Sequence, residues 1–89
     1  MPSRRITIVN KLGLHARAAA KFVTLASRFG CDIRLDRDGR RVNAKSIMGV
    51  MMLAAARGAE LLLSAEGEDA EQALASLEAL VADRFGEGE

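Results

Sequence analysis

Cysteine, histidine, proline and aromatic residues are scarce in this chain of 89 residues. The sequence has one Cys, one His, one Pro and three Phe, and it contains neither Trp nor Tyr. A single cysteine excludes an internal disulfide, and one Cys with one His cannot supply the four ligands of a structural zinc site. We therefore expect apolar packing to hold the core, without a covalent or metal crosslink.

A strong charge of one sign and a long apolar run are also missing. The 13 Lys and Arg residues nearly balance the 12 Asp and Glu residues, so the chain lacks the basic excess of a dedicated nucleic-acid binder. No apolar run approaches the ~20 residues that span a bilayer, and residues 1–5 lead into a strand-like segment instead of a signal-peptide core. We therefore predict a cytoplasmic monomer without membrane insertion.

The spacing of apolar residues predicts seven elements in the order βαββαβα. Alternation indicates strands at residues 5–10, 32–37, 40–43 and 60–66. Helical spacing indicates helices at residues 16–29, 47–54 and 70–85. This order favours an α+β domain with one mainly antiparallel four-stranded sheet and helices on one face. We expect a single domain over residues 1–89, ordered over about 4–85, with a frayed acidic tail at 86–89.

Local signals predict how these elements begin and end. The Asp38-Gly39 pair is typical of a two-residue hairpin turn, in which both residues take positive φ. Gly30 is expected to end the first helix in the left-handed region, and Gly58 to end the second. Asp69, with a glutamine three residues later, forms the capping-box pattern that starts the last helix.

His15 is the single imidazole and lies one residue before the first predicted helix. The first amides of a helix lack intrahelical partners and form the positive end of its dipole, which makes this position an anion site. Arg17 adds a guanidinium that can form paired hydrogen bonds to phosphate oxygens, and Gly13 lets the backbone turn tightly before His15. The positive helix end disfavours a charged imidazolium and leaves His15 available as a nucleophile. These features predict a phosphorylated histidine, whereas a lone His at a helix start can equally be a surface residue or a weak cap.

Ser46 has two interpretations. Serine is a leading N-cap residue, and a cap at the start of the second helix explains it without further function. A phosphate on Ser46 would add about two negative charges at that helix start, beside Ile47 and Met48. The residue is therefore either an ordinary cap or a regulatory phosphorylation switch.

The second helix carries more apolar side chains than a domain of this size can bury. Val50 and Leu53 are expected to face the core. The remaining large side chains then have no buried place: Ile47, Met48, Met51 and Met52. Core filling is the ordinary use of methionine, whereas an exposed cluster of flexible thioethers suits a surface that accepts several partners.

Other functional classes find less support. A small RNA-binding or ligand-sensing module would carry aromatic residues on its sheet strands, but Phe22, Phe29 and Phe85 all fall on predicted helices. Cys31 is interpreted as a small apolar residue, because nothing near it marks a reactive thiol. With no glycine-rich nucleotide loop, paired-carboxylate site or Ser/His/Asp set, we expect no cofactor and no metal.

Two separated motifs carry a family resemblance. The segments NKLGLHAR at residues 10–17 and NAKSIMGVMML at residues 43–53 closely resemble the HPr family, the histidine-containing phosphocarriers of the bacterial phosphoenolpyruvate-dependent phosphotransferase system. The resemblance covers essentially residues 4–85. It implies an open-faced β-sandwich, in which a four-stranded antiparallel sheet lies under three helices, and it implies a carrier and not an enzyme in the strict sense.

The resemblance also implies a role for each candidate residue. His15 would be phosphorylated on the ring nitrogen that faces the helix amides, would receive the group from phosphorylated enzyme I and would pass it to an enzyme IIA domain. Arg17 would help to hold the phosphoryl group, and Ser46 matches the regulatory site of the HPr kinase/phosphorylase. The shared docking surface around the histidine would comprise Ala16, Ala20, Ile47, Met48 and Met51.

One departure from the family pattern follows Arg17. The family commonly has Pro there, which favours the first helical turn by fixing φ, whereas this chain has Ala18. The HARA segment at residues 15–18 is also similar to the nitrogen-related branch of the family, the NPr type. Sugar-linked transfer and a nitrogen-related regulatory phosphorelay therefore both remain open, while the presence of His15 disfavours action through Ser46 alone.

Overall fold

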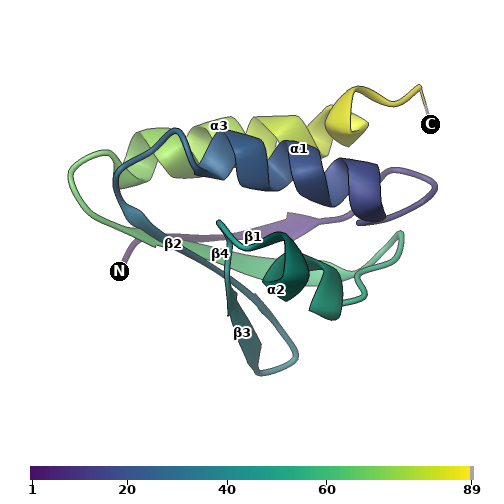
Figure 1. Cartoon of the computed structure of the whole chain (residues 1–89), viewed down its shortest axis with the longest axis horizontal. Coiled ribbons are helices and arrows are strands. Elements are labelled where there is room, and N and C mark those ends of the chain that lie inside the picture. The colour runs from purple at the N-terminus through teal and green to yellow at the C-terminus, as the bar shows by residue number, and fades with distance from the viewer. Residues whose placement is uncertain (89) are drawn as a thin grey trace.

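The computed structural model describes residues 1–88 and contains the predicted elements in the predicted order (Figure 1). The strands are β1 (Ser3–Thr7), β2 (Asp32–Arg37), β3 (Arg40–Asn43) and β4 (Glu60–Glu66). The helices are α1 (Ala16–Ala26), α2 (Ile47–Met52) and α3 (Ala70–Ala82), followed by a short 3-10 turn, η1 (Arg84–Gly86). The predicted α+β class and the βαββαβα order are confirmed.

The sheet has the order β1-β4-β2-β3, and every neighbouring pair is antiparallel. α1 and α3 run along one face of the sheet, and α2 lies in contact with α1 on the same side (Figure 1). Alternation along a strand predicts which side chains face inward but not which strands pair. The strand order therefore could not be derived from the sequence, although the antiparallel pairing could.

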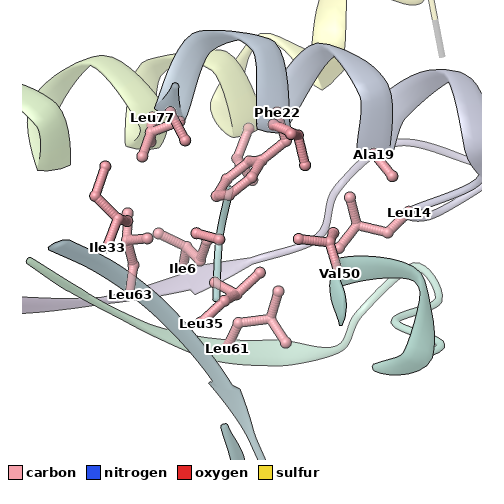
Figure 2. Close-up of a cluster of buried hydrophobic side chains, with 14 of the residues drawn as sticks. Ile6, Leu14, Ala19, Phe22, Ile33, Leu35, Val50, Leu61, Leu63 and Leu77 are labelled. Atoms are coloured by element: carbon pink, nitrogen blue, oxygen red, sulfur yellow. The ribbon is translucent and has the colours of Figure 1, made fainter. Parts of the chain in front are cut away.

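The core fills the space between the sheet and the helices. Its residues on the sheet side, of which Ile8 lies just beyond β1, are those that alternation predicts: Ile6, Ile8, Ile33, Leu35, Leu61, Leu63 and Ala65. Phe22 of α1 and Leu77 of α3 reach them from the helices, and Val50 reaches them from α2 (Figure 2). Val50 and Leu53 are buried, as predicted for the core side of α2. Within residues 1–88, no helix is long and apolar enough to cross a membrane.

Several element ends differ from the prediction. α1 ends at Ala26, and Gly30 does not take the left-handed conformation. The Asp69 side chain makes no cap hydrogen bond to α3. Instead, its carboxylate accepts hydrogen bonds from the backbone N–H groups of Gly30 at 2.9 Å and Cys31 at 3.0 Å. The chain between α1 and β2 is thus held by a tertiary contact, which local helix-capping rules do not anticipate.

α2 also ends earlier than predicted, while the central hairpin is confirmed. The helix ends at Met52, and Ala54 takes the left-handed conformation with φ of 50°, well before Gly58. In the turn between β2 and β3, Asp38 and Gly39 have φ of 52° and 85°, as a two-residue hairpin requires. α2 is therefore a short helix of six residues.

Candidate functional site

The loop before α1 is held in place by backbone contacts at Gly13. This glycine has φ of +70°, and a Cβ atom there would lie 2.7 Å from the Ala55 carbonyl oxygen. The next residue, Leu14, donates its backbone N–H to the same Ala55 oxygen at 2.8 Å. The positive φ agrees with the predicted tight turn, and the close approach to Ala55 is a further reason why only glycine fits here. The loop consequently delivers His15 to a fixed position at the start of α1.

His15 is the N-cap residue of α1, with extended backbone angles of φ −74° and ψ 175°. Its carbonyl oxygen accepts the first helical hydrogen bond, from the N–H of Ala19 at 2.8 Å. Its side chain forms no cap hydrogen bond. The earliest amides of α1 therefore offer hydrogen-bond donors and the positive end of the helix dipole to an anion beside the imidazole.

The imidazole contacts the C-terminal segment of the chain. His15 Nε2 and Glu87 Oε2 form a hydrogen-bonded pair. The other carboxylate oxygen of Glu87 accepts a hydrogen bond from Asn10 Nδ2 at 3.1 Å. The hydrogen bond from His15, with that from Asn10, lowers the pKa of Glu87 from its ordinary value of 4.5. The prediction of a solvated tail is wrong for Glu87, while Glu89 lies outside the described residues.

The chain reaches this position through a turn after α3. Arg84, Phe85 and Gly86 all have positive φ, of 57°, 56° and 79°. The Phe85 side chain is fully buried, and its carbonyl oxygen accepts a hydrogen bond from Lys21 Nζ at 2.7 Å. The prediction of a helix continuing to residue 85 is wrong, because Phe85 keeps its place in the core without helical backbone. The turn brings Glu87 back over the start of α1.

A surface hollow surrounds the imidazole, which we call the His15 hollow. It is lined by Lys11, Leu12, His15, Ala16, Arg17, Glu87 and Gly88. Arg17 is exposed, and its side chain forms no hydrogen bond or ion pair with any residue in the described range 1–88. The hollow therefore places an imidazole, a free guanidinium and a helix start around one space that an anion can enter.

Comparisons with known proteins agree with this geometry. A family model described as "PTS HPr component phosphorylation site" matches residues 2–83. The chain belongs to the HPr family. It is 55% identical over 89 residues to the phosphocarrier protein HPr of Cupriavidus necator, and 56% identical over 90 residues to that of Pseudomonas aeruginosa, each match covering both chains completely. The crystal structure of an HPr from Thermoanaerobacter tengcongensis superposes with a TM-score of 0.96 at 48% identity, with both chains fully covered.

Membership of the HPr family gives the function of the chain. The relatives are phosphocarrier proteins, and the family model is built around their phosphorylation site. The chain is therefore a phosphocarrier of the phosphotransferase system and not a catalyst in its own right. The predicted family, fold and carrier function are confirmed.

The second motif of this HPr forms α2 and its two ends. Ser46 is the N-cap residue, and its Oγ accepts a hydrogen bond from the backbone N–H of Gly49 at 3.1 Å. At the other end, Arg37 Nη1 donates to the carbonyl oxygens of Leu53 and Ala54 at 2.8 and 3.0 Å. Arg40 Nη1 donates to the Met52 carbonyl at 3.0 Å. Basic side chains thus satisfy the free carbonyls after a helix that is too short to stand alone.

Large apolar side chains of α2 are exposed, as the sequence predicts. The exposed fractions are 43% for Ile47, 73% for Met48, 41% for Met51 and 59% for Met52. Leu12, which lines the His15 hollow, is 68% exposed. An exposed group of this kind on a small protein is typical of a contact surface.

Three residues near His15 could not be predicted from the sequence as parts of the site. Glu87 belongs to a tail that composition alone assigns to solvent, and Asn10 ends a predicted strand without any signal of its burial. Leu12 lies inside the first motif but follows no apolar periodicity. Only the tertiary fold, which brings the end of α3 to the start of α1, places Glu87 beside the imidazole (Figure 1).

Proposed function

We propose that His15 is the phosphorylated residue of this HPr-family chain, receiving the group from phosphorylated enzyme I and passing it to an enzyme IIA domain. The observation that carries the proposal is the position of the imidazole at the open start of α1, with 28% of its side chain exposed. Phosphoryl transfer requires positioning and charge stabilisation more than covalent chemistry from the protein. The amides at the start of α1 supply that stabilisation.

Arg17 is proposed to hold the phosphoryl oxygens. Its guanidinium lines the His15 hollow and is not engaged by another side chain of the described structure, so it can reorient toward an incoming dianion at little cost. One exposed Arg stabilises a phosphohistidine only modestly. This suits a carrier, because the group must also leave toward the next protein.

The test of the proposal uses enzyme I and labelled phosphoenolpyruvate. The parent is expected to acquire an acid-labile, alkali-stable label, and His15→Ala is expected to acquire none. Arg17→Ala should still be labelled, with an acceptance rate about 10- to 100-fold lower, the range expected for a lost hydrogen bond to a charged group. Equal labelling of the parent and His15→Ala would refute the assignment.

The docking surface is proposed to comprise Ala16, Ala20, Ile47, Met48 and Met51. Support comes from the contact between α1 and α2, which brings the two groups onto one side, and from the exposure of the α2 side chains. Because enzyme I and the IIA domain would use the same surface, the two partners bind in turn. Flexible methionine side chains can adapt to both.

Met48→Asp tests this surface directly. The substitution places a charge where an apolar side chain is 73% exposed, so folding should be little affected. We expect weaker binding to enzyme I, measured by titration calorimetry. The matched control, Gln72→Asp, adds the same charge on an exposed residue at the start of α3, and equal weakening by both variants would argue against the docking surface.

Ser46 is proposed as a regulatory phosphorylation site for an HPr kinase/phosphorylase. Its side chain is half-buried at the start of α2, next to the exposed Ile47. A phosphate there would add about two negative charges beside the docking surface and so oppose partner binding. Incubation with ATP and the kinase should label the parent but not Ser46→Ala; label on both would remove Ser46 from the proposal.

The nitrogen-related phosphorelay is the second candidate, favoured by Ala18 in the HARA segment. Ala18 is fully buried in α1, so the missing proline changes the first helical turn and not the exposed chemistry. Measuring transfer from the phosphorylated chain to a sugar-type and to a nitrogen-type IIA domain separates the two assignments. In both, the chain is proposed to act as a cytoplasmic monomer.

A further inference from the structure

We propose that Glu87 is a positioning residue for phosphoryl transfer: held by the buried Asn10, it binds the Nε2–H group of His15 and leaves Nδ1 as the nucleophile. This inference rests on the proposed function, in which His15 accepts the phosphoryl group. It assigns a positioning role in that function to a carboxylate that is distant from His15 in the sequence.

The contact with Glu87 determines which ring nitrogen is free. Because the pKa of Glu87 lies below its ordinary value, its carboxylate is ionised at neutral pH and can only accept hydrogen bonds. The Nε2 atom of His15 must then carry a proton, so any free lone pair of the ring is on Nδ1. Nδ1 is the ring nitrogen nearer to the His15 backbone, and hence nearer to the start of α1. In the proposed arrangement, the free lone pair faces the anion-binding amides at the start of α1.

Asn10 fixes the carboxylate relative to the loop that carries His15. The Asn10 side chain is fully buried, and its Nδ2 donates to the Gly13 carbonyl oxygen at 2.8 Å as well as to Glu87. The Gly13 oxygen also accepts the backbone N–H of His15 at 2.9 Å. Since both neighbours of Nδ2 are acceptors, the orientation of the amide is determined. One buried side chain thus joins the backbone before His15 to the group that binds its ring.

The position of Glu87 does not depend on its own side chain. Two residues earlier, Phe85 is fully buried, and Lys21 binds its carbonyl oxygen. The positive φ values of Arg84, Phe85 and Gly86 set the direction of the chain beyond this anchor. A substitution at Glu87 is therefore expected to remove the carboxylate while the turn stays in place. Such a variant can test the carboxylate separately from the fold of the turn.

The transfer step gives the carboxylate a chemical role. The Nδ1 lone pair of His15 attacks phosphorus, and the bond from phosphorus to the donor atom breaks with its electron pair leaving on the donor. The ring keeps its Nε2 proton and becomes positively charged, and Glu87 stabilises that charge through the hydrogen bond to Nε2. Because the carboxylate binds Nε2, its negative charge lies away from the phosphoryl group, which faces Arg17 and the start of α1.

Three variants of the full chain test the inference. Glu87→Ala removes the acceptor, Glu87→Gln keeps an acceptor oxygen but removes the charge, and Glu68→Gln is the matched control at an exposed carboxylate in the loop before α3. Nitrogen-15 NMR of the His15 ring at neutral pH reports the Nε2–H proton. Single-turnover acceptance from phosphorylated enzyme I gives the rate and the apparent KM for enzyme I.

We expect an Nε2–H signal protected from solvent exchange in the parent and in Glu68→Gln, a weaker signal in Glu87→Gln, and none in Glu87→Ala. The acceptance rate of Glu87→Ala should fall about tenfold, the lower end for a lost carboxylate partner of a functional histidine, with KM unchanged. An unchanged rate with His15 still labelled would overturn the inference and leave the proposed function standing. A faster rate would also overturn it, because Glu87 would then cover the site, and an unlabelled parent would overturn both.

Discussion

Gly13 is the residue on which the geometry of the His15 loop most depends. Its backbone lies in the left-handed region, and its missing Cβ leaves room for the Ala55 carbonyl and the Ala56 backbone, which a Cβ would approach to 2.7 and 2.9 Å. An L-residue in this conformation is strained in any surroundings. Here the neighbouring atoms belong to the backbone, so they cannot relieve a clash with a Cβ atom by changing rotamer as a flexible side chain can.

Gly13→Ala is expected to lower the free energy of unfolding by about 2 kcal/mol, from left-handed strain and the close backbone contact together. Urea unfolding followed by circular dichroism measures the change. Gly30→Ala is the matched control, because Gly30 has no positive φ and open space where its Cβ would lie. A loss no greater than that of Gly30→Ala would contradict the role assigned to Gly13.

Residue roles could be predicted from the sequence where the chemistry is local. The N-cap positions of His15 and Ser46 are confirmed because they follow from the start of one helix each, while phosphorylation of either residue stays a prediction. Glu87 could not be identified, since its partner is far away in the sequence and the turn toward it uses positive φ at Arg84 and Phe85. No sequence pattern favours that conformation at these two residue types.

At the level of elements, Asp69 joins the end of α1 to the start of α3. Its carboxylate accepts the N–H groups of Gly30 and Cys31, and these hydrogen bonds, that of Gly30 first, lower the pKa of Asp69 from its ordinary value of 3.8. A carboxyl group with a lowered pKa in the folded state contributes stability above its ordinary pKa. That contribution is lost as the pH falls through the folded value.

Asp69→Asn should therefore unfold at a lower urea concentration than the parent at pH 7, and the gap should narrow as the pH falls below about 3.8. Urea midpoints at a series of pH values measure this dependence. Glu68→Gln, which removes a neighbouring exposed carboxylate, is expected to follow the parent throughout. A gap between Asp69→Asn and the parent that stayed constant from pH 7 to pH 3 would show that the charge of Asp69 makes no contribution.

Across the whole molecule, one core connects all the elements and encloses the single thiol. Cys31 is 4% exposed, and burial, together with the Asp69 carboxylate, raises the pKa of its thiol above the ordinary value of 9.0. The interpretation of Cys31 as a small apolar residue agrees with this burial. Because Cys31 belongs to the buried core cluster, the thiol is expected to react only when that core opens.

Iodoacetamide should accordingly label Cys31 slowly in the native protein, at a rate set by global unfolding. Gly13→Ala, although far from Cys31 in the loop before α1, should then raise the labelling rate about 30-fold, the factor that matches a loss of about 2 kcal/mol. Mass spectrometry of intact protein over time gives the rates. Equal rates in the two proteins would indicate a local opening near Cys31 instead.

The layers of the molecule could be predicted from the sequence, but their internal order could not. Alternation in the strands and helical spacing indicated the buried faces, including Leu35 and Leu77. The order β1-β4-β2-β3 depends on long-range pairing, such as Ile6 opposite Leu61, which no local pattern specifies. For the same reason, local sequence patterns do not predict that Asn10 lies near the C-terminal turn.

Arg37 and Arg40 hold the C-terminal end of α2, and this contact affects the exposed methionines of that helix. An isolated helix becomes marginally stable only at about 12 residues, and α2 has six. The hairpin therefore stabilises its conformation through Arg37 and Arg40. The hairpin at the edge of the sheet therefore determines the conformation of the exposed methionines of α2, although it lies outside that helix. Because Ala55 directly follows the two carbonyls that Arg37 binds and itself holds the loop before His15, a change that loosened this hairpin is expected to disturb both the exposed methionines and the imidazole.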